Sequence, residues 1–135
     1  MEFDIAIIGG GIVGAATFYQ LQKKNPTLKI ALFEKENILA KHQTGHNSGV
    51  LHSGLYYKPG SLKAKNCIEG KQEMIAFAKE YGIAHDICGK VVVASNQQEI
   101  VRLEKIHQTG IENKIDDIER ISSDQVKEIE PFVEC

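Results

Sequence analysis

Residues 3–34, FDIAIIGGGIVGAATFYQLQKKNPTLKIALFE, contain the pattern that decides the fold. Ile5 to Ile8 form a continuous apolar run, which predicts a strand buried on both faces of a parallel sheet. The glycines of Gly9-x-Gly11-x-x-Gly14 follow at once. In such a turn the first glycine permits the tight bend, the second lets the backbone approach a pyrophosphate, and the third lets a helix pack close to the strand.

The signals of a helix and of a second strand follow the glycine turn. The helix is expected to begin at Ile12 and to stop at Asn25-Pro26, with two lysines at its negative end. Its predicted buried face consists of Ile12, Ala15, Ala16 and Tyr19. A second strand is predicted from Lys29 to Phe33. Glu34 then stands about 20 residues beyond the last glycine, where a carboxylate accepts hydrogen bonds from an adenosine ribose.

Together these signals predict a dinucleotide-binding βαβ unit, with the amides at the start of the helix directed toward the phosphates. The alternative is an α/β turn that binds nothing, because glycine turns alone are common. A doubly wound fold needs several parallel strands, and no second βαβ repeat follows residue 34. We therefore expect a sheet that is incomplete in this chain, and a chain that is the N-terminal part of a larger enzyme.

Length and composition limit the possible classes of protein. The 135 residues, 42% hydrophobic and 25% charged, are typical of a soluble globular protein. A net charge of −2 offers no attraction to nucleic acid or to an anionic membrane. No apolar run approaches the roughly 20 residues of a transmembrane helix, and the N-terminus lacks the features of a signal peptide, so a cytoplasmic protein is expected. The three cysteines show no CxxC spacing, which predicts reduced thiols.

A long glycine-rich segment comes after the second strand. Residues 35–43 are expected to form a connecting loop. Residues 44–61, TGHNSGVLHSGLYYKPGS, have no helical or strand period, and loops of this length are usually functional or disordered. Their apolar and aromatic side chains argue against disorder. We therefore expect an ordered loop that approaches a flat ligand, with Thr44, Asn47 and Ser48 as donors to phosphate or ring heteroatoms.

The rest of the chain is predicted to alternate helices and short strands. The expected elements are a helix from Leu62 to Tyr81 with Ser61 as N-cap and Gly82 as stop, a strand from Lys90 to Ser95, a helix from Gln97 to Gln108 ended by Gly110, a strand from Asp117 to Ile121, and a helix from Gln125 to Ile129 capped by residues 122–124. The character of the sequence changes near residue 82, which indicates the start of a second domain.

Four stretches carry a family resemblance: DIAIIGGGIVG at 4–14, HQTGHNSGVLHSGLYYKPGSLKAKNC at 42–67, GKVVVAS at 89–95 and IEPFV at 129–133. On these stretches the chain resembles the FAD-dependent D-amino-acid oxidase superfamily and, within it, the L-2-hydroxyglutarate dehydrogenase/oxidase family. The first motif is common to many flavoproteins, whereas the second is far more specific. Relatives of this kind are around three times longer, so the resemblance covers their N-terminal part.

The resemblance implies an α/β fold with a Rossmann-like FAD-binding βαβ unit, in a two-domain flavoprotein oxidoreductase. Residues 1–81 would be the N-terminal part of the FAD-binding domain, and residues 82–135 the start of an α+β substrate-binding domain. The residues expected to bind FAD are Gly9, Gly11, Ile12, Val13, Gly14, Glu34, Lys35, Thr44, Asn47, Ser48, Gly49, His52 and Ser53. The glycines would line the pyrophosphate, Glu34 would bind the adenosine ribose, and the later residues would lead toward the flavin.

The reaction that the resemblance implies is oxidation of L-2-hydroxyglutarate to 2-oxoglutarate. Hydride would pass from C2 to flavin N5, and the electrons would then go to a quinone or to oxygen. A base must also take the hydroxyl proton, and His52 is the candidate because an imidazole titrates in the useful range. That His52 only hydrogen-bonds backbone or flavin is an open alternative. Quinone-linked relatives can lie at the inner face of a membrane, although no amphipathic anchor is evident in these residues.

The remaining histidines give no metal site. His42 and His46 are four residues apart, but Thr44-Gly45 interrupts the helix that would bring them together, and no thiol or carboxylate completes a ligand set. His85 and His107 are most simply surface or loop residues. No metal is therefore predicted.

Basic residues that could bind an anionic substrate are few. The lysines Lys58, Lys63 and Lys65 could attract one, although a solvated charge cluster is the commoner explanation. A dicarboxylate is normally held by an arginine fork. Arg102 and Arg120 lie in segments expected to be exposed, so we expect the substrate clamp to come from outside these residues.

Three other readings of the sequence stay open. The first is a related flavin oxidase that acts on an amine, an amino acid or glycerol 3-phosphate. The second is a nicotinamide dehydrogenase, in which a third strand would normally follow soon after the second. The third is an inactive N-terminal fragment, because 135 residues with an incomplete sheet are expected to bind FAD weakly and to turn over nothing.

Overall fold

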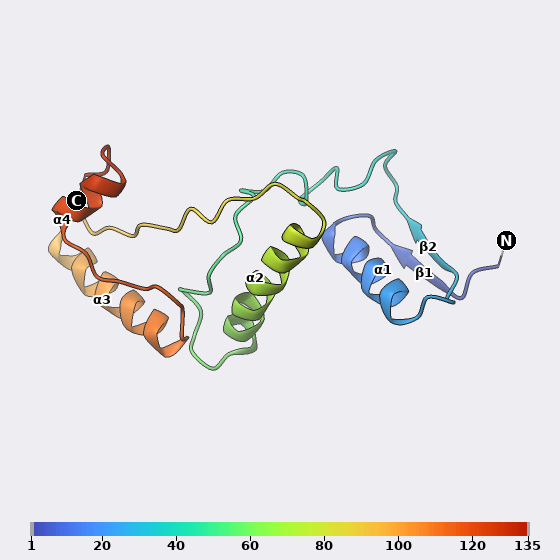
Figure 1. Cartoon of the computed structure of the whole chain (residues 1–135), viewed down its shortest axis with the longest axis horizontal. Helices are drawn as coiled ribbons and strands as arrows, with labels where there is room; N and C mark the ends of the chain where they lie inside the picture. Colours follow the sequence, from blue (N-terminus) through green and yellow to red (C-terminus); the bar gives the residue numbers. More distant parts are fainter. Residues whose placement is uncertain (1, 135) are drawn as a thin grey trace. The chain divides into compact units, whose positions relative to one another are not determined.

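A computed structural model describes residues 2–134 of the chain (Figure 1). Contacts along the chain define two compact units, a first unit that ends at Val50 and a second unit that begins at Leu51. The first unit contains β1 (Ile5–Ile8), α1 (Ile12–Lys24) and β2 (Ile30–Phe33), and the second contains α2 (Leu62–Glu80), α3 (Gln97–Glu112) and α4 (Ser123–Ile129).

The first unit is a βαβ arrangement with a small parallel sheet. β1 and β2 pair in parallel, with Ile5 opposite Ile30 and Ile8 opposite Phe33. The helix between them packs against both strands. Before the sheet begins, the Asp4 carboxylate accepts a 2.8 Å hydrogen bond from the Lys29 amide, which ties the two strands at their starts. The predicted α/β class and the order strand, glycine turn, helix, strand are thus confirmed.

The ends of α1 follow the local signals, but its buried face differs from the predicted one. Lys23 and Lys24 occupy the last turn, and the Asn25 amide closes the helix on the Leu21 carbonyl at 2.9 Å. Ile12 is 57% exposed and Ala16 is also exposed, whereas the half-buried positions include Ala15, Phe18 and Tyr19. A two-stranded sheet offers α1 only a narrow surface, so a narrower stripe of the helix is covered.

The expectation that β1 is buried on both faces is wrong for this chain. Burial alternates along the strand, with Ile5 and Ile7 half-buried and Ile8 80% exposed. α1 covers one face of the sheet, and within the described part of the first unit no other helix covers the opposite face. β1 is therefore more apolar than its partial burial in this structure requires.

The helices of the second unit begin at capped positions. The Ser61 hydroxyl accepts a hydrogen bond from the Ala64 amide at 3.2 Å, and Asn96 Oδ1 accepts one from the Glu99 amide at 3.0 Å. A capping box between Ser122 and Gln125 begins α4, so capping within residues 122–124 is confirmed, but the helix starts two residues before the predicted Gln125. α2 ends one residue before the predicted end, and the following Gly82 has φ +63.

Three predictions for the second unit fail, the end of one helix and two strands, because packing and strand pairing depend on residues far away in the sequence. α3 continues past Gly110 to Glu112, and Gly110 is a buried position inside the helix. The segments Lys90–Ser95 and Asp117–Ile121 are not strands, because within residues 2–134 no other strand pairs with them. Instead, residues 92–94 and Ile121 line one groove together with α3 residues and Val126 of α4, so the apolar run is partly buried without a ladder.

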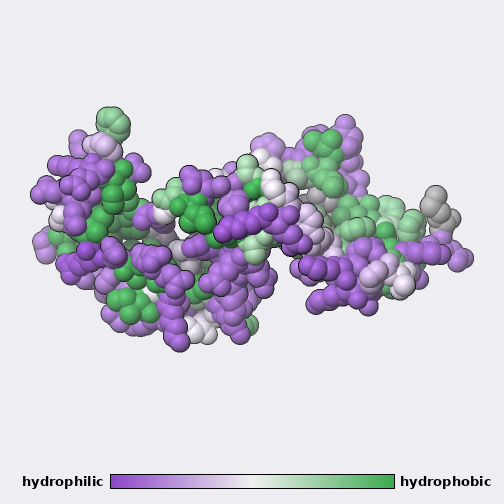
Figure 2. All heavy atoms as spheres, in the orientation of Figure 1, coloured by the Kyte–Doolittle hydropathy of each residue, from purple (hydrophilic) through white to green (hydrophobic). Residues whose placement is uncertain are grey.

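Little of the described chain is deeply buried. The buried apolar residues are Leu55, Ala64, Ala78 and Val126, all in the second unit. Apolar side chains such as Val13, Leu62 and Phe132 are largely exposed, and Figure 2 shows green apolar atoms reaching the surface among the purple hydrophilic ones. The cores of both units are therefore small. The domain boundary after residue 81 stays a prediction.

Two further features concern the membrane and the thiols. Among residues 2–134, no helix is both long enough and apolar enough to cross a membrane. Cys67 and Cys88 are free thiols, as the sequence predicts, while Cys135 lies outside the described residues.

Candidate functional site

The glycine turn joins β1 to α1 with the geometry that the motif predicts. Gly9 has φ +103, a conformation that side chains other than glycine rarely adopt, and its amide donates a 2.7 Å hydrogen bond to the Phe33 carbonyl of β2. A Cβ at Gly14 would collide with the Gly9 carbonyl oxygen. The first glycine is therefore needed for the bend, and the third for the close approach of helix and strand.

The N-terminus of α1 opens beside Thr44. The Ile12 amide donates to the Thr44 hydroxyl oxygen at 3.0 Å, and a Cβ at Gly11 would lie 3.2 Å from the same oxygen. The amides of Val13 and Gly14 belong to the first turn and have no partner within the helix. This end of the helix carries the positive pole of its dipole. It can therefore bind an anionic oxygen, and the Thr44 hydroxyl keeps its own proton to donate.

Glu34 lies directly after β2 and is bound to the glycine turn. Its Oε2 accepts a 2.6 Å hydrogen bond from the Gly10 amide, and its Oε1 accepts a 3.1 Å hydrogen bond from the Glu36 amide. The hydrogen bond from Gly10, followed by that from Glu36, lowers the pKa of the Glu34 carboxyl below its ordinary value. Glu34 is therefore an anion near neutral pH.

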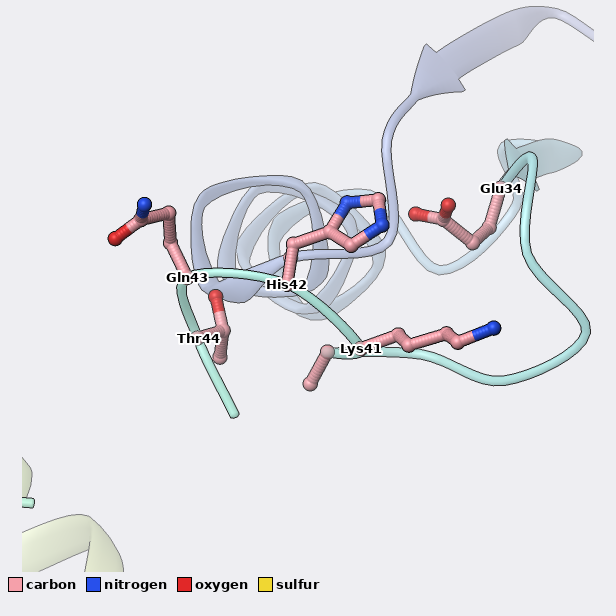
Figure 3. Close-up of a pocket in the computed structure, with 7 residues that line it drawn as sticks. Glu34, Lys41, His42, Gln43 and Thr44 are labelled. Atoms are coloured by element: carbon pink, nitrogen blue, oxygen red, sulfur yellow. The ribbon is translucent and has the colours of Figure 1, made fainter. Parts of the chain in front are cut away.

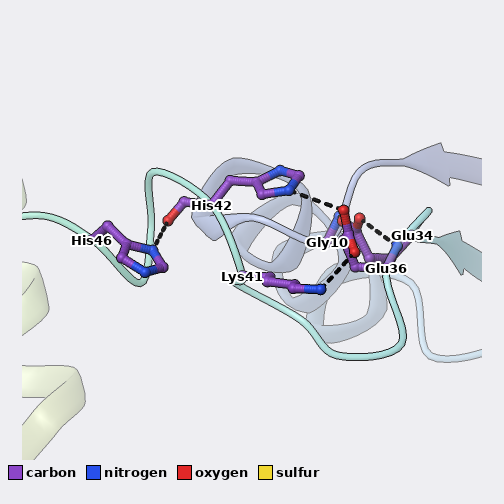
Figure 4. A network of polar contacts seen from close by, with 6 residues as sticks. All are labelled: Gly10, Glu34, Glu36, Lys41, His42 and His46. Carbon is purple, nitrogen blue, oxygen red and sulfur yellow. Dashed lines mark hydrogen bonds and ion pairs between the residues drawn. The ribbon is translucent and has the colours of Figure 1, made fainter.

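A second acidic residue organises the loop after β2 (Figure 4). Glu36 forms an ion pair with Lys41 at 2.9 Å, and its other carboxylate oxygen lies 3.0 Å from His42 Nε2. The hydrogen bond from Lys41 is the largest cause that lowers the pKa of the Glu36 carboxyl. His46 Nδ1 lies 2.9 Å from the His42 carbonyl oxygen, so the two rings do not converge. Among residues 2–134, no three His, Cys, Asp or Glu side chains are grouped as metal ligands.

A pocket of about 150 Å³ lies between the start of α1 and this loop (Figure 3). Its lining residues are Gly11, Glu34, Ala40, Lys41, His42, Gln43 and Thr44. Glu34 stands at the end of β2 and Thr44 beside the first turn of the helix. The pocket thus combines a carboxylate that can accept hydrogen bonds from hydroxyl groups with a helix N-terminus of the kind that suits phosphate. These residues fit the ribose and phosphate of a dinucleotide such as FAD.

The loop residues predicted to bind FAD lie in both units. In the first unit, Asn47 Nδ2 donates to the carbonyls of Thr44 at 2.6 Å and Gln43 at 3.3 Å, and its Oδ1 accepts from the Gly49 amide at 2.7 Å. Asn47 therefore shapes the loop in this structure rather than presenting a donor to a ligand. Lys35 and Ser48 are exposed, and Gly49 has φ +66.

The other two predicted residues belong to the second unit. His52 is exposed, and its carbonyl oxygen accepts a hydrogen bond from the Cys67 thiol at 3.1 Å. Ser53 is half-buried next to it. That these thirteen residues contact FAD stays a prediction.

The pocket also contains residues that the sequence patterns do not single out. Ala40, with φ +60, donates from its amide to the Gly10 carbonyl at 3.1 Å, which folds residues 39–45 back toward the glycine turn. This return brings Lys41, His42 and Gln43 to the pocket. The available signals were that these three residues stand immediately before Thr44 and that His42 and Gln43 begin the stretch 42–67 quoted above, since no local pattern predicts a return of the loop.

The comparisons with known proteins show the family to which the chain belongs. A family model described as "FAD dependent oxidoreductase" matches residues 4–135, which is nearly the whole chain. The chain therefore belongs to the FAD dependent oxidoreductase family.

Particular relatives are similar over almost the whole chain. An L-2-hydroxyglutarate dehydrogenase of Indibacter alkaliphilus is 51% identical over 132 residues, which are 98% of this chain and 33% of the relative. The mitochondrial L-2-hydroxyglutarate dehydrogenase of Dictyostelium discoideum is 49% identical over 97% of this chain and 30% of its own length. The mitochondrial enzyme of the same name from Homo sapiens is 47% identical over 97% of the chain and 28% of its own length. The chain thus spans about a third of the length of these curated relatives.

Proposed function

We propose that the enzyme containing this chain oxidises L-2-hydroxyglutarate to 2-oxoglutarate. The observation that carries the proposal is the 47–51% identity to proteins named L-2-hydroxyglutarate dehydrogenase over 97–98% of the chain. The family match and the dinucleotide-type pocket support the flavin part of the reaction. The electron acceptor is proposed to be a quinone or oxygen.

In this proposal the first unit holds the ADP part of FAD. The Thr44 hydroxyl and the first-turn amides of α1, including those of Val13 and Gly14, bind the pyrophosphate, while Glu34 accepts from the ribose hydroxyls. The lowered pKa of the Glu34 carboxyl supports that role, because an anion is the better acceptor. When bound, FAD supplies the acceptor for the hydride that leaves C2 of the substrate.

We assign to His52 the removal of the substrate hydroxyl proton. Oxidation of an alcohol releases one hydride and one proton, and the proton needs a base. The exposed side chain of His52 supports this role, since the imidazole is open to a ligand. The competing role for His52, a hydrogen bond to backbone or flavin without proton transfer, predicts an unchanged pH profile when the residue is replaced.

The substrate carboxylates are proposed to bind outside these residues. Arg120 is already paired with Glu104 at 2.6 Å, and its side chain is 71% exposed. Arg102 is exposed as well. Of the lysines considered above, Lys63 lies 4.6 Å from the centroid of the Tyr57 ring, and Lys65 is 3.9 Å from Glu69. The lysines lack the planar fork of a guanidinium, and of the two arginines that have it, both are exposed and Arg120 is already paired with a carboxylate.

The division into an FAD-binding part, residues 1–81, and a substrate-binding part, residues 82–135, is retained as part of the proposal. A cytoplasmic location also stays a proposal, and two of the relatives described above are named mitochondrial. We further propose that the 135 residues alone bind FAD weakly and are inactive, because the sheet has two strands and buried apolar residues are few. Dye reduction by the isolated chain would contradict this.

The proposal is tested with a substrate panel on the full-length enzyme that contains this chain. The panel consists of L-2-hydroxyglutarate, D-2-hydroxyglutarate, glycerol 3-phosphate, an amine and an amino acid, each with a quinone analogue or oxygen as acceptor. We expect turnover with L-2-hydroxyglutarate and little with the other compounds. Faster turnover of an amine, an amino acid or glycerol 3-phosphate would assign the chain to another oxidase of the same family.

A further inference from the structure

A tight turn follows the proposed catalytic histidine by two residues. The Tyr57 amide donates to the Gly54 carbonyl at 3.1 Å, which closes the turn Gly54–Tyr57. Gly54 has φ +88, and Leu55 at the tip is buried. Because the turn has one closing hydrogen bond, its shape depends on what packs around it.

The C-terminal end of α3 holds this turn from one side. Asn113 follows the last helical residue and is 8% exposed, and its side-chain Nδ2 donates to the Tyr57 carbonyl at 2.8 Å and to the Gly54 carbonyl at 3.3 Å. One side-chain amide thus bridges both ends of the turn across more than 50 residues of sequence. Gly110 makes this approach possible, because a Cβ there would lie 2.9 Å from Leu55 Cδ1.

Residues of α2 contact the same segment. A Cβ at Gly54 would lie 3.2 Å from Ile68 Cγ1, so the turn packs directly on this helix. The Cys67 thiol donates to the His52 carbonyl at 3.1 Å. The backbone of residues 52–57 is therefore held by a thiol of α2 at its start and by the Asn113 amide at its end.

We propose that Asn113 is a positioning residue, whose side-chain amide holds the turn Gly54–Tyr57 and through it sets the place of His52. This inference rests on the proposed function for the role of His52, but not for the turn itself. Asn113 acts through two hydrogen bonds to carbonyl groups, one buried and one partly buried, and a donor is required at that position. An acceptor of the same shape would face two oxygens and push the turn away.

The first test is hydrogen exchange in the full-length flavoenzyme, which needs no substrate. Asn113→Asp keeps the shape and removes the donor, and Asn113→Ala removes the donor without adding charge in case the aspartate prevents folding. We expect the amides of residues 54–57 to exchange roughly tenfold faster in either variant. The matched control is Gln98→Glu in the first turn of α3, an exposed amide at the end of the helix where a carboxylate suits the dipole, and it should leave exchange at residues 54–57 unchanged. Unchanged exchange in both Asn113 variants would overturn the inference.

The second test asks whether Asn113 acts through His52. The rate of flavin reduction is measured for the unsubstituted enzyme, His52→Gln, Asn113→Ala and the double variant. We expect Asn113→Ala to lower kcat with little change in KM, and to add little once His52 is replaced. If the rate loss in the double variant equals the product of the losses in the two single variants, the two residues act independently and the link to His52 is overturned. If the unsubstituted enzyme reduces no flavin with L-2-hydroxyglutarate, the proposed function fails, and the exchange measurement alone then decides whether Asn113 holds the turn.

Discussion

The carboxylate of Glu34 accepts a 2.6 Å hydrogen bond from the backbone amide of Gly10. The acidic residue at the end of β2 is thus tied to the glycine turn at the end of β1, 24 residues earlier. An ionised carboxylate has about four acceptor positions, and the Gly10 and Glu36 amides occupy two of them. The same side chain can therefore stabilise the turn and still accept hydrogen bonds from a ribose.

Replacing Glu34 by glutamine should weaken FAD binding roughly tenfold in the full-length enzyme, because one acceptor oxygen becomes a donor and the charge is lost. The dissociation constant can be measured by the quenching of flavin fluorescence. Glu73→Gln, an exposed residue of α2, is the matched control and should leave the constant unchanged. Equal affinity for Glu34→Gln and the unsubstituted enzyme would exclude Glu34 from the site.

Gly14→Ala should destabilise the enzyme by about 1–3 kcal/mol and lower its flavin content, because the added methyl group meets the Gly9 carbonyl. Gly70→Ala is the control, since a Cβ there meets no atom within 4 Å. The control should stabilise α2 by roughly 1 kcal/mol, because alanine is the better helix former. Thermal unfolding and the ratio of flavin to protein absorbance measure both effects. A Gly14→Ala enzyme with normal stability would contradict the close helix–strand approach.

Acidification should open the loop after β2. Hydrogen bonds and the Lys41 ion pair lower the pKa of the Glu34 and Glu36 carboxyls below the ordinary value of 4.5. Their stabilising contribution is therefore complete above that value and is lost as pH falls through the lower pKa of the folded state. Release of FAD, followed by fluorescence during acid titration, should show this step, and the step should be reduced in a Glu34→Gln/Glu36→Gln double variant. An identical acid step in the double variant would assign the release to other groups.

His52→Gln should lower kcat by about a hundredfold or more and remove the limb of the pH–rate profile that belongs to the base. His85→Gln is the control, because His85 is exposed and its Nδ1 lies 2.8 Å from the nearby Ile83 carbonyl. Steady-state kinetics across pH would measure both. An unchanged maximal rate and profile for His52→Gln would leave this residue with a hydrogen-bonding role at most.

Local signals predicted most of the elements. A run of β-branched residues, a glycine turn and the stop at Asn25 act over a few neighbouring residues, so β1, α1 and β2 lie where the sequence indicates. A strand, in contrast, needs a partner, and Lys90–Ser95 finds none within the described part of the chain. Gly110 was predicted to end α3. Instead it lies inside the helix, where the side chains of Leu55 and Ile118 pack so closely that a Cβ would collide with them. Such packing cannot be read from neighbours in sequence.

The sequence likewise predicted part of the candidate site, the glycine turn with Glu34 and Thr44, but not all of the residues around it. Glycine spacing and the distance to Glu34 belong to one motif, and the structure brings them together with Thr44. Lys41 and His42 were missed because their place at the pocket depends on the Ala40–Gly10 hydrogen bond, which returns the loop. Asn113 was missed because its partners are more than 50 residues away.

The most direct measurement is the visible absorption spectrum of the purified full-length enzyme, taken before and after addition of L-2-hydroxyglutarate without oxygen. We predict an oxidised flavin band that bleaches when the substrate is added, because hydride leaves the substrate and reduces FAD. A band that stays oxidised with L-2-hydroxyglutarate but bleaches with another compound of the panel would contradict the proposed substrate. A protein that carries no flavin at all would contradict the account of the site.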